Sequence, residues 1–266
     1  MEEAPIPMWV RRIALSFKGR IENFFGVTYF NRCFSQIGSY TREPNQFAKT
    51  IEAFQLKYSA VATKDSELPS HGAFIVVCNH PHGLWDGVIV GDHLLRARAC
   101  TKIVASFLTN HLIGFEQYFI SVDPRSNKRR CKLNQDARLT MRDQLCSGQP
   151  LVICPAGQVS RFNLRNLSTK DTAWTNLPIE LATRFNVPII PIFIGGKNSW
   201  WYQLVTMYSL TLANALLVRE FRLMAGKPGR VVVGKAISPN DLDQFDGKTE
   251  KTRYIRAQTY ALSNFM

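Results

Sequence analysis

The sequence predicts one α/β domain in which a mostly parallel sheet is flanked by helices. Short apolar runs alternate with longer amphipathic stretches along the chain, a pattern typical of parallel strands connected by helices. The 266 residues are enough for one such domain with a real core. The apolar fraction of 45% is that of an ordinary globular protein, which excludes the disordered and fibrous classes.

The expected elements follow one another from residue 74 to residue 263. The run Phe-Ile-Val-Val-Cys-Asn at 74–79 has the length and apolarity of a buried strand, and the helix after residue 132 should end before Gly148. The predicted strands are 74–79, 102–106, 118–122, 151–154, 187–194 and 230–233. The predicted helices are 84–98, 133–147, 177–185 and 249–263.

The first 49 residues are predicted to form an N-terminal basic, amphipathic, membrane-associating helical segment, and residues 50–266 to form the α/β domain. Apolar residues recur there at three- and four-residue steps, as on one helical face: Trp9, Ile13, Phe17, Ile21 and Phe24. The cations between them are Arg11, Arg12, Lys18 and Arg20. This pattern suits a helix lying in a membrane interface, but an amphipathic helix packed on its own domain is an open alternative. No signal peptide is expected.

A second apolar stretch, residues 199–218, carries no charge and begins Ser-Trp-Trp-Tyr. Its length and aromatic end would permit a membrane span. Six polar residues dilute its apolarity, so a buried or membrane-facing helix is the preferred interpretation. A block rich in Lys and Arg follows at 219–235 and could contact lipid headgroups.

The net charge of +13 indicates an anionic partner: nucleic acid, anionic lipid or a phosphorylated substrate. None of the six cysteines forms a Cys-x-x-Cys pair, which argues against zinc ribbons and thioredoxin-like sites. Cys78 and Cys154 lie in strand-like runs, where a free cysteine acts as a small apolar residue. They are expected to be reduced thiols.

The segment Asn-His-Pro-His-Gly-Leu-Trp-Asp-Gly at 79–87 is the most informative one, because it links a buried strand to a helix. Open α/β sheets place their ligands at such strand ends. His80 can take a proton from a hydroxyl or amine, and Asp86 can fold back to fix its tautomer and stabilise the imidazolium. His82, four residues before Asp86, is a rival base.

This segment resembles the first motif of the glycerolipid acyltransferases, the superfamily that includes lysophosphatidate acyltransferases. The five residues between His80 and Asp86, one more than in the commonest family form, look like a bacterial branch of lyso-ornithine-lipid acyltransferases and so-called haemolysins. Pro-Ala-Gly-Gln-Val-Ser at 155–160 resembles the third motif, and Val-Pro-Ile-Ile-Pro-Ile at 187–192 the fourth. Residues 114–125 fall where the second motif belongs.

The resemblance implies that His80 and Asp86 are catalytic and that a further set of residues binds the substrates. These are Asn79, His82, Gly83, Arg125, Pro155, Ala156, Gly157, Gln158, Ser160 and Arg161. The loop 155–160 would hold the acceptor or stabilise the oxyanion through backbone N–H groups. Because Ala156 stands where the family has a carboxylate, and Arg125 and Arg161 are displaced from the expected arginines, a lyso-aminolipid or another lysolipid fits better than glycerol 3-phosphate.

We therefore expect an O-acyltransferase that moves a fatty acyl chain from acyl carrier protein or acyl-CoA to a lysolipid hydroxyl at the membrane surface. The acceptor would be lyso-ornithine lipid or a lysophosphatidate-like lipid. No cofactor, no metal and no nucleic-acid partner is expected. The location would be the cytoplasmic face of a bacterial inner membrane, as a peripheral or monotopic protein.

Three alternatives stay open. His80, His82 and Asp86, with Asp92 and His93 nearby, resemble the ligand cluster of a metallohydrolase. The positive charge permits a nucleic-acid-binding module, although no motif of that class is visible. The eroded third motif permits an inactive, lipid-binding family member.

Overall fold

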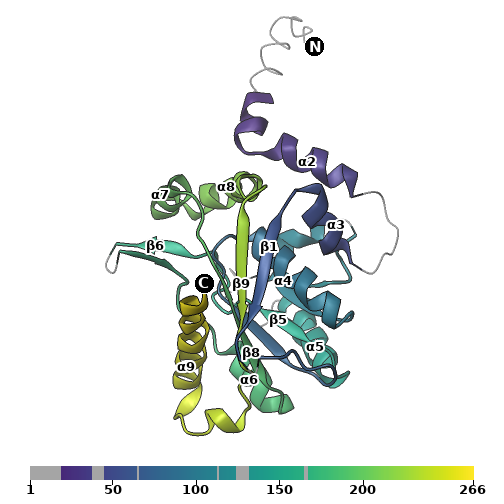
Figure 1. Ribbon diagram of the computed structural model, residues 1–266, viewed down its shortest axis with the longest axis vertical. Coiled ribbons are helices and arrows are strands. Elements are labelled where there is room, and N and C mark those ends of the chain that lie inside the picture. The colour runs from purple at the N-terminus through teal and green to yellow at the C-terminus, as the bar shows by residue number, and fades with distance from the viewer. Residues whose placement is uncertain (1–18, 38–44, 65, 113, 124–131, 165–166) are drawn as a thin grey trace, which may run out of the picture.

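A computed structural model describes residues 19–37, 45–64, 66–112, 114–123, 132–164 and 167–266 (Figure 1). Its strands are β1 (Lys57–Ala62), β2 (Ile75–Cys78), β3 (Lys102–Ser106), β4 (Phe119–Val122), β5 (Leu151–Ile153), β6 (Arg161–Asn163), β7 (Ser168–Lys170), β8 (Ile189–Ile194) and β9 (Pro228–Val233). Its α-helices are α2 (Val27–Gln36), α3 (Gln46–Ala53), α4 (Leu84–Ala97), α5 (Lys132–Cys146), α6 (Leu177–Phe185), α7 (Trp200–Tyr208), α8 (Leu210–Leu223) and α9 (Gly247–Ala261). Short 3-10 helices are η1 (Phe107–His111), η2 (Asn240–Leu242) and η3 (Leu262–Phe265).

Seven of the strands form one sheet in the order β1-β9-β8-β2-β5-β3-β4, and β6 and β7 form a separate antiparallel hairpin. Neighbours in the large sheet are parallel except at β8–β9. The central strand β2 pairs with β5 on one side and β8 on the other, so that Ile75 lies beside Leu151 and Ile189. The predicted α/β class with a mostly parallel sheet is therefore confirmed.

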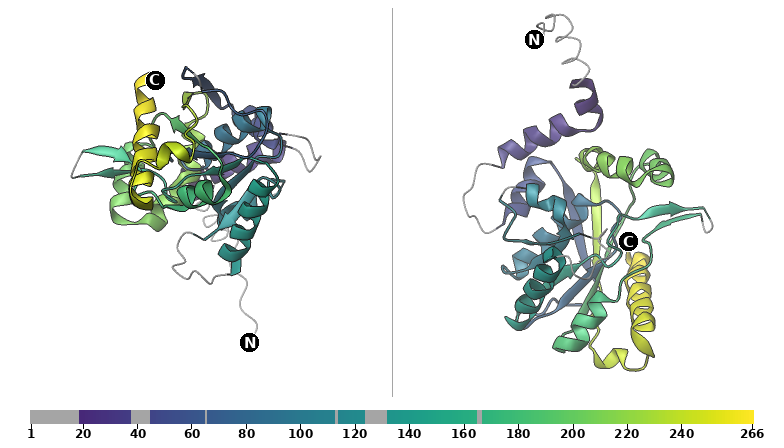
Figure 2. Two further views of the ribbon diagram at one scale, coloured as in Figure 1. Left: turned by 90° about the horizontal axis from the view of Figure 1, so that it is seen from below. Right: turned by 180° about the vertical axis from the view of Figure 1, so that it is seen from behind.

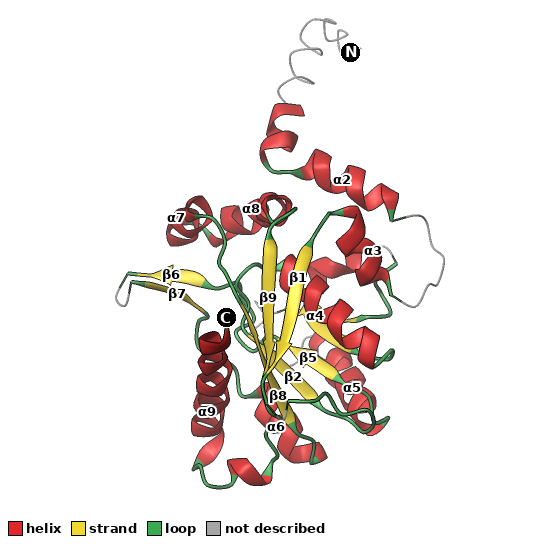
Figure 3. Ribbon diagram, in the orientation of Figure 1, coloured by secondary structure: helices red, strands yellow, loops and turns green. Residues whose placement is uncertain are grey.

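Alternate residues of the central strands enter two different cores, as the two-residue period of a strand requires. Val76 and Cys78 of β2 belong to the core that α2, α3 and α4 cover. Ile75 and Val77 belong to the other core, which α5, α6 and α9 cover. Helices thus lie on both faces of the sheet (Figure 3), and this burial on both faces explains why the central strands are almost purely apolar.

The strands and helices expected between residues 74 and 263 are all present, with ends that agree to within two residues. The sequence reading missed β1, which has an exposed pattern rather than an apolar run. It also missed the short β6–β7 hairpin and the reversed direction of β9. The pairing of β1 and β9 joins segments that are distant in the sequence, and the hairpin strands have three residues each, too few to show a period.

The described part of the N-terminal segment packs on the domain. The ring of Phe30 in α2 lies 5.2 Å from that of Phe54, which lies 4.9 Å from Phe221 in α8. The predicted boundary between residues 49 and 50 falls inside α3, so the described residues show no break in packing there. Ile21 and Phe24 are exposed, as a membrane-facing surface would need, while Trp9, Ile13 and Phe17 lie outside the described residues.

The uncharged stretch at 199–218 is not one helix but two, α7 and α8, which meet at Ser209. Ser209 ends one helix with extended backbone, and its hydroxyl accepts a hydrogen bond from the N–H of Leu212 to begin the next. The right-hand view of Figure 2 shows this pair of helices next to the β6–β7 hairpin. Among the described residues, no helix has both the length and the apolarity to cross a bilayer.

Candidate active site

The site lies where the carboxyl ends of β2, β5 and β8 meet at one edge of the sheet. Because these strands are parallel neighbours, the segments that leave them are brought together. The segment after β2 holds His80, the segment after β5 begins with Cys154, and the segment after β8 begins with Gly195. The sequence motifs at 79–87 and 155–160, which lie far apart in the chain, therefore share one site.

His80 and Asp86 form a close pair at this edge. The Nδ1 atom of His80 lies 2.9 Å from Oδ2 of Asp86. The angle between these two groups is not that of a regular hydrogen bond. The histidine side chain is 22% exposed, whereas the aspartate is fully buried in the first turn of α4. With Nδ1 turned to the carboxylate, the opposite ring nitrogen, Nε2, is the one left to face a substrate.

Asp86 also holds the loop that carries His80. Its Oδ2 atom accepts the backbone N–H groups of His82 and Gly83, both at 2.9 Å. Asp86 therefore satisfies free N–H groups at the start of α4 and at the same time faces the imidazole. Among the described residues, none makes a hydrogen bond to its other oxygen, Oδ1.

The charges around His80 favour its protonated form. Burial alone would lower the pKa of the ring, but the neighbouring Cys154 sulfur and the Asp86 carboxylate raise it well above its usual value. The hydrogen bond with Cys78 and the charge of His80 together lower the pKa of Cys154 to about 6, against the effect of burial. The imidazole thus lies between two anionic groups, which makes it a stronger base than a free histidine.

His82, the rival base, faces away from the open edge. It is buried, its Nε2 lies 3.0 Å from the carbonyl oxygen of Gly195, and its Nδ1 lies 3.4 Å from Oδ1 of Asn198. Its ring meets Trp85 edge-on at 5.0 Å. Both ring nitrogens are therefore turned to protein groups, and His80 is the histidine of this loop that a substrate can reach.

Two further motif residues shape the site rather than line it. Asn79 bridges the ends of β2 and β8, because its amide donates to the carbonyl of Ile194 at 2.8 Å and accepts the N–H of Ile194 at 2.7 Å. Gly83 has a φ of 86°, and a Cβ atom there would lie 3.1 Å from Leu217. A larger residue at position 83 would be strained and crowded.

The loop after β5 is bound to the His80 loop. The N–H of Ser160 donates to the carbonyl of His80 at 2.7 Å, and the N–H of Gly157 donates to the carbonyl of Cys154 at 3.0 Å. These two N–H groups are therefore already used and do not form the predicted oxyanion hole in this arrangement. Gly157 and Gln158 are exposed and Arg161 is half-buried, whereas Pro155, Ala156 and Ser160 are buried.

Asp171 is a residue of the site that sequence reasoning missed. Its carboxylate accepts the backbone N–H of His80 at 3.1 Å, the hydroxyl of Ser160, and the indole N–H of Trp174 at 2.9 Å. Asp171 thus connects the loop after β2 to the loop after β5. It follows the β6–β7 hairpin, and because neither a motif nor a spacing marked it, only the fold reveals this role.

Arg125, the predicted contact from the second motif, lies outside the described residues. Among the residues that are described, no three His, Cys, Asp or Glu side chains gather as metal ligands. In particular, Asp92 of the proposed metal cluster instead accepts hydrogen bonds from Asn45, Tyr58 and Arg96.

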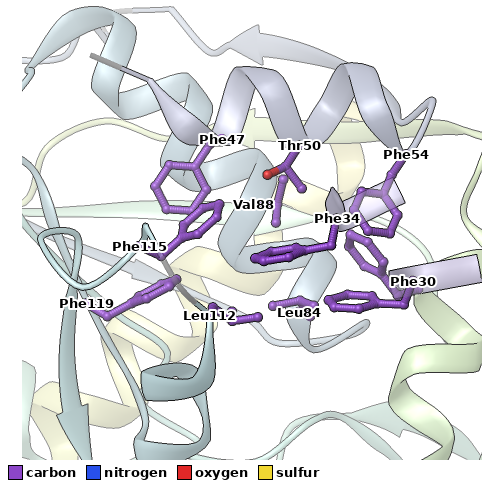
Figure 4. A pocket seen from close by; sticks show the side chains of 11 residues that line it. Phe30, Phe34, Phe47, Thr50, Phe54, Leu84, Val88, Leu112, Phe115 and Phe119 are labelled. Carbon is purple, nitrogen blue, oxygen red and sulfur yellow. The ribbon is translucent and has the colours of Figure 1, made fainter. Parts of the chain in front are cut away.

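An aromatic pocket lies behind the start of α4 (Figure 4). Leu84 and Val88 of α4 line it together with Thr50, Leu112 and seven phenylalanines, at positions 30, 34, 47, 54, 115, 119 and 221. Its free volume is about 10 Å³, room for roughly one water molecule. In this arrangement the side chains fill the space themselves.

Comparison with known proteins gives a family, a related protein and a related structure. The family model described as "Acyltransferase" matches residues 10–266. A lyso-glycine lipid O-acyltransferase of Bacteroides thetaiotaomicron is 24% identical over 202 residues, which cover 73% of this chain and 72% of that protein. The crystal structure of the 1-acyl-sn-glycerophosphate acyltransferase of Thermotoga maritima is 14% identical, with a TM-score of 0.48 over 96% of each chain.

Proposed function

The chain belongs to the acyltransferase family whose model spans residues 10–266, and we propose that it transfers a fatty acyl chain from a thioester to the hydroxyl group of a lysolipid. Family membership confirms the resemblance found in the sequence and the predicted enzyme class. The His80–Asp86 pair at the carboxyl edge of the sheet is the observation that carries the proposal. It supplies a base next to the open edge without an additional cofactor.

The proposed chemistry is direct attack. Nε2 of His80 takes the proton of the acceptor hydroxyl while the oxygen attacks the thioester carbonyl, and Asp86 stabilises the imidazolium that forms. The tetrahedral oxyanion then collapses, the carbon–sulfur bond breaks, and the imidazolium returns the proton to the leaving thiolate. Residues 157 and 158 are exposed, which supports the proposal that they contact the acceptor.

For the acceptor we propose a lyso-aminolipid. The matched Bacteroides protein is named for a lyso-glycine lipid, and Ala156 replaces the carboxylate of the third motif, as the sequence already suggested. The acyl donor is acyl carrier protein or acyl-CoA, since each presents the same thioester.

The test is an acylation assay with purified protein. Each donor is paired with lyso-glycine lipid, lyso-ornithine lipid and lysophosphatidate, and products are measured by mass spectrometry. We expect a diacylated aminolipid as the main product and none with the His80→Ala variant. Failure of every donor and acceptor pair would refute the proposal, and lysophosphatidate as the best acceptor would overturn the aminolipid assignment.

We also propose that α7 and α8 place the site on a membrane surface. Trp200, Trp201 and Tyr208 are 61%, 53% and 87% exposed, and the two indole rings stack with centroids 4.0 Å apart. Leu204, Met207, Leu210 and Leu212 are exposed beside them. Tryptophan and tyrosine favour the boundary between lipid headgroups and acyl chains, and an exposed apolar patch of this kind marks an interaction surface.

The ends of the helix pair also suit this location. No charged residue occurs from position 198 to 218, whereas Lys197 precedes the stretch and Arg219 and Arg222 follow it. The backbone N–H and the hydroxyl of Ser199 both donate to Glu220 at 2.7 Å, which fixes the start of α7 to the end of α8. Cations at both ends and the net charge of +13 favour an anionic leaflet, as at the cytoplasmic face of a bacterial inner membrane.

Sedimentation with phosphatidylglycerol vesicles tests this surface. We expect Trp200→Ser combined with Trp201→Ser to weaken vesicle binding about tenfold or more, because two interfacial anchors are lost. Leu139→Ser, which removes an exposed leucine from α5, is the matched control and should bind normally. Equal binding by the double variant and the wild type would refute the membrane role of α7.

A further inference from the structure

Two thiols lie side by side next to His80. Cys78 is the last residue of β2 and Cys154 is the first residue after β5. The parallel register pairs Val77 with Ile153, so the two cysteines are the next residues along the two segments. The two sulfur atoms are 3.2 Å apart, and both cysteines are free thiols.

The two sulfurs differ in access and in charge. Cys78 is buried at 1% exposure, whereas Cys154 is only partly buried. A hydrogen bond joins the two sulfurs, and this bond and the charge of His80 lower the pKa of Cys154, although burial opposes the shift. A thiol with a lowered pKa in contact with a second thiol is the arrangement that reactive dithiols use.

We propose that Cys78 and Cys154 form a redox-active dithiol, which hydrogen peroxide closes to a disulfide beside His80. The Cys154 thiolate attacks one peroxide oxygen, so that an S–O bond forms, the O–O bond breaks and hydroxide leaves. Cys78 then attacks the sulfur of this sulfenic acid, and the S–O bond breaks as the S–S bond forms. In total two thiols and one hydrogen peroxide give one disulfide and two water molecules.

The positions of the backbone fit this product. A disulfide needs a sulfur–sulfur distance of about 2.05 Å and Cα atoms about 4.4–6.8 Å apart. Neighbouring strands of a sheet lie about 4.8 Å apart, within that range. The sulfurs must therefore approach by roughly 1 Å, which small rotations of the two side chains and small shifts of the strand ends can supply.

Closure would disturb the site in two ways. It removes the anionic sulfur that helps to keep His80 basic. It also pulls the end of β5 towards β2, and a shift of about 1 Å in a catalytic group can cost about 100-fold in rate. The effect on turnover rests on the proposed acyl transfer, whereas formation of the disulfide does not.

The experiment uses protein in which the other four cysteines, Cys33, Cys100, Cys131 and Cys146, are replaced by alanine. Thiols are counted and the intact mass is measured before and after a few equivalents of peroxide, and again after dithiothreitol. We expect loss of both thiols, a mass lower by about 2 Da, and full recovery with the reductant. The wild-type protein is the control for misfolding of the variant. Peptide mass spectrometry should find the same disulfide in it.

Two matched variants separate the roles of the sulfurs. With Cys78→Ala, Cys154 should gain oxygen and be trapped by dimedone instead of forming a link. With Cys154→Ala, the buried Cys78 should stay reduced. Persistence of both thiols in excess peroxide, or oxidation of Cys154 to sulfinic acid while Cys78 remains free, would overturn the proposal.

Acyl transfer is measured in parallel. We expect oxidation to lower turnover about tenfold or more in the two-cysteine protein and the reductant to restore it, with smaller reversible loss in Cys78→Ala. A complete disulfide with unchanged turnover would overturn the link to His80. Because the thiol count needs no acyl substrate, failure of the proposed acyl transfer and failure of the dithiol would be seen separately.

Discussion

Two buried aspartates on helix α4 show what separates a reactive carboxylate from a structural one. Asp86 and Asp92 lie six positions apart on the same helix, and both are fully buried. Asp92 accepts hydrogen bonds from Asn45 at 2.9 Å, from Tyr58 at 2.7 Å and from Arg96 at 3.0 Å. Both of its oxygens accept hydrogen bonds from these groups. Burial and the hydrogen bond to Asp92 raise the pKa of Tyr58, so this hydroxyl keeps its proton.

Asp86 differs from Asp92 in its partners and in the hydrogen bonds that its two oxygens accept. One oxygen receives two backbone N–H groups and faces the imidazole of His80, while the other has no hydrogen bond among the described residues. His80 is partly exposed and can exchange a proton with a substrate. Burial of a carboxylate therefore does not by itself indicate catalysis; a partner that can gain and lose a proton at an open edge does.

The largest expected effect on turnover comes from replacing His80, the partner of Asp86. His80→Ala should lower kcat for lysolipid acylation about 1,000-fold, the range typical for loss of a general base. His71→Ala, which removes an exposed histidine at the other end of β2, is the control and should leave kcat unchanged. If His80→Ala kept its activity while His82→Gln lost it, the base would be His82.

The second prediction concerns Asp92 and stability. Asp92→Asn should lower the free energy of unfolding by about 2 kcal/mol, because charged hydrogen bonds to Arg96 and Tyr58 are weakened in a buried place. Urea denaturation measures this loss. The turnover of the folded fraction should stay close to that of the wild type, and a loss of turnover comparable to that of His80→Ala would show that the two ends of α4 are not separate in function.

The third prediction concerns the pH profile. Burial lowers the pKa of His80, but Cys154 and Asp86 together raise it above its usual value, so the neutral, basic ring accumulates only as the pH rises. Cys154→Ala removes one of the raising groups and leaves Asp86, so the pKa of His80 should fall. The acidic limb of the kcat/KM profile should therefore move to lower pH, whereas Cys100→Ala should not move it. An unchanged profile in Cys154→Ala would show that this sulfur does not act on the ring.

The sequence predicted the elements and residues that depend on local pattern. The apolar run at 74–79 and the segment that follows it located β2, His80 and Asp86, and the ordered motifs placed the loop 155–160 beside them. The roles of His80 and Asp86 stay predictions until the variants are assayed. The separation of His82 from the open edge needed the structure, since both histidines lie in one short loop.

What the sequence did not predict depends on contacts between distant segments. Asp171 reaches His80 across 91 positions, and Asn45 reaches Asp92 across 47. Both are polar residues without a motif, so nothing local distinguishes them from solvated side chains. The contact between Cys78 and Cys154 likewise depends on the pairing of β2 with β5. From the sequence, only the reduced state of the two cysteines was expected.

The ratio of kcat/KM between the Asp86→Asn and Asp92→Asn enzymes tests the central claim most directly. Each value is taken with the same lysolipid and donor and normalised to the folded fraction. Because only Asp86 faces the base, we predict a value for Asp86→Asn that is about 100-fold or more below that for Asp92→Asn. Equal values for the two variants would contradict the assignment of His80 and Asp86 as the catalytic pair.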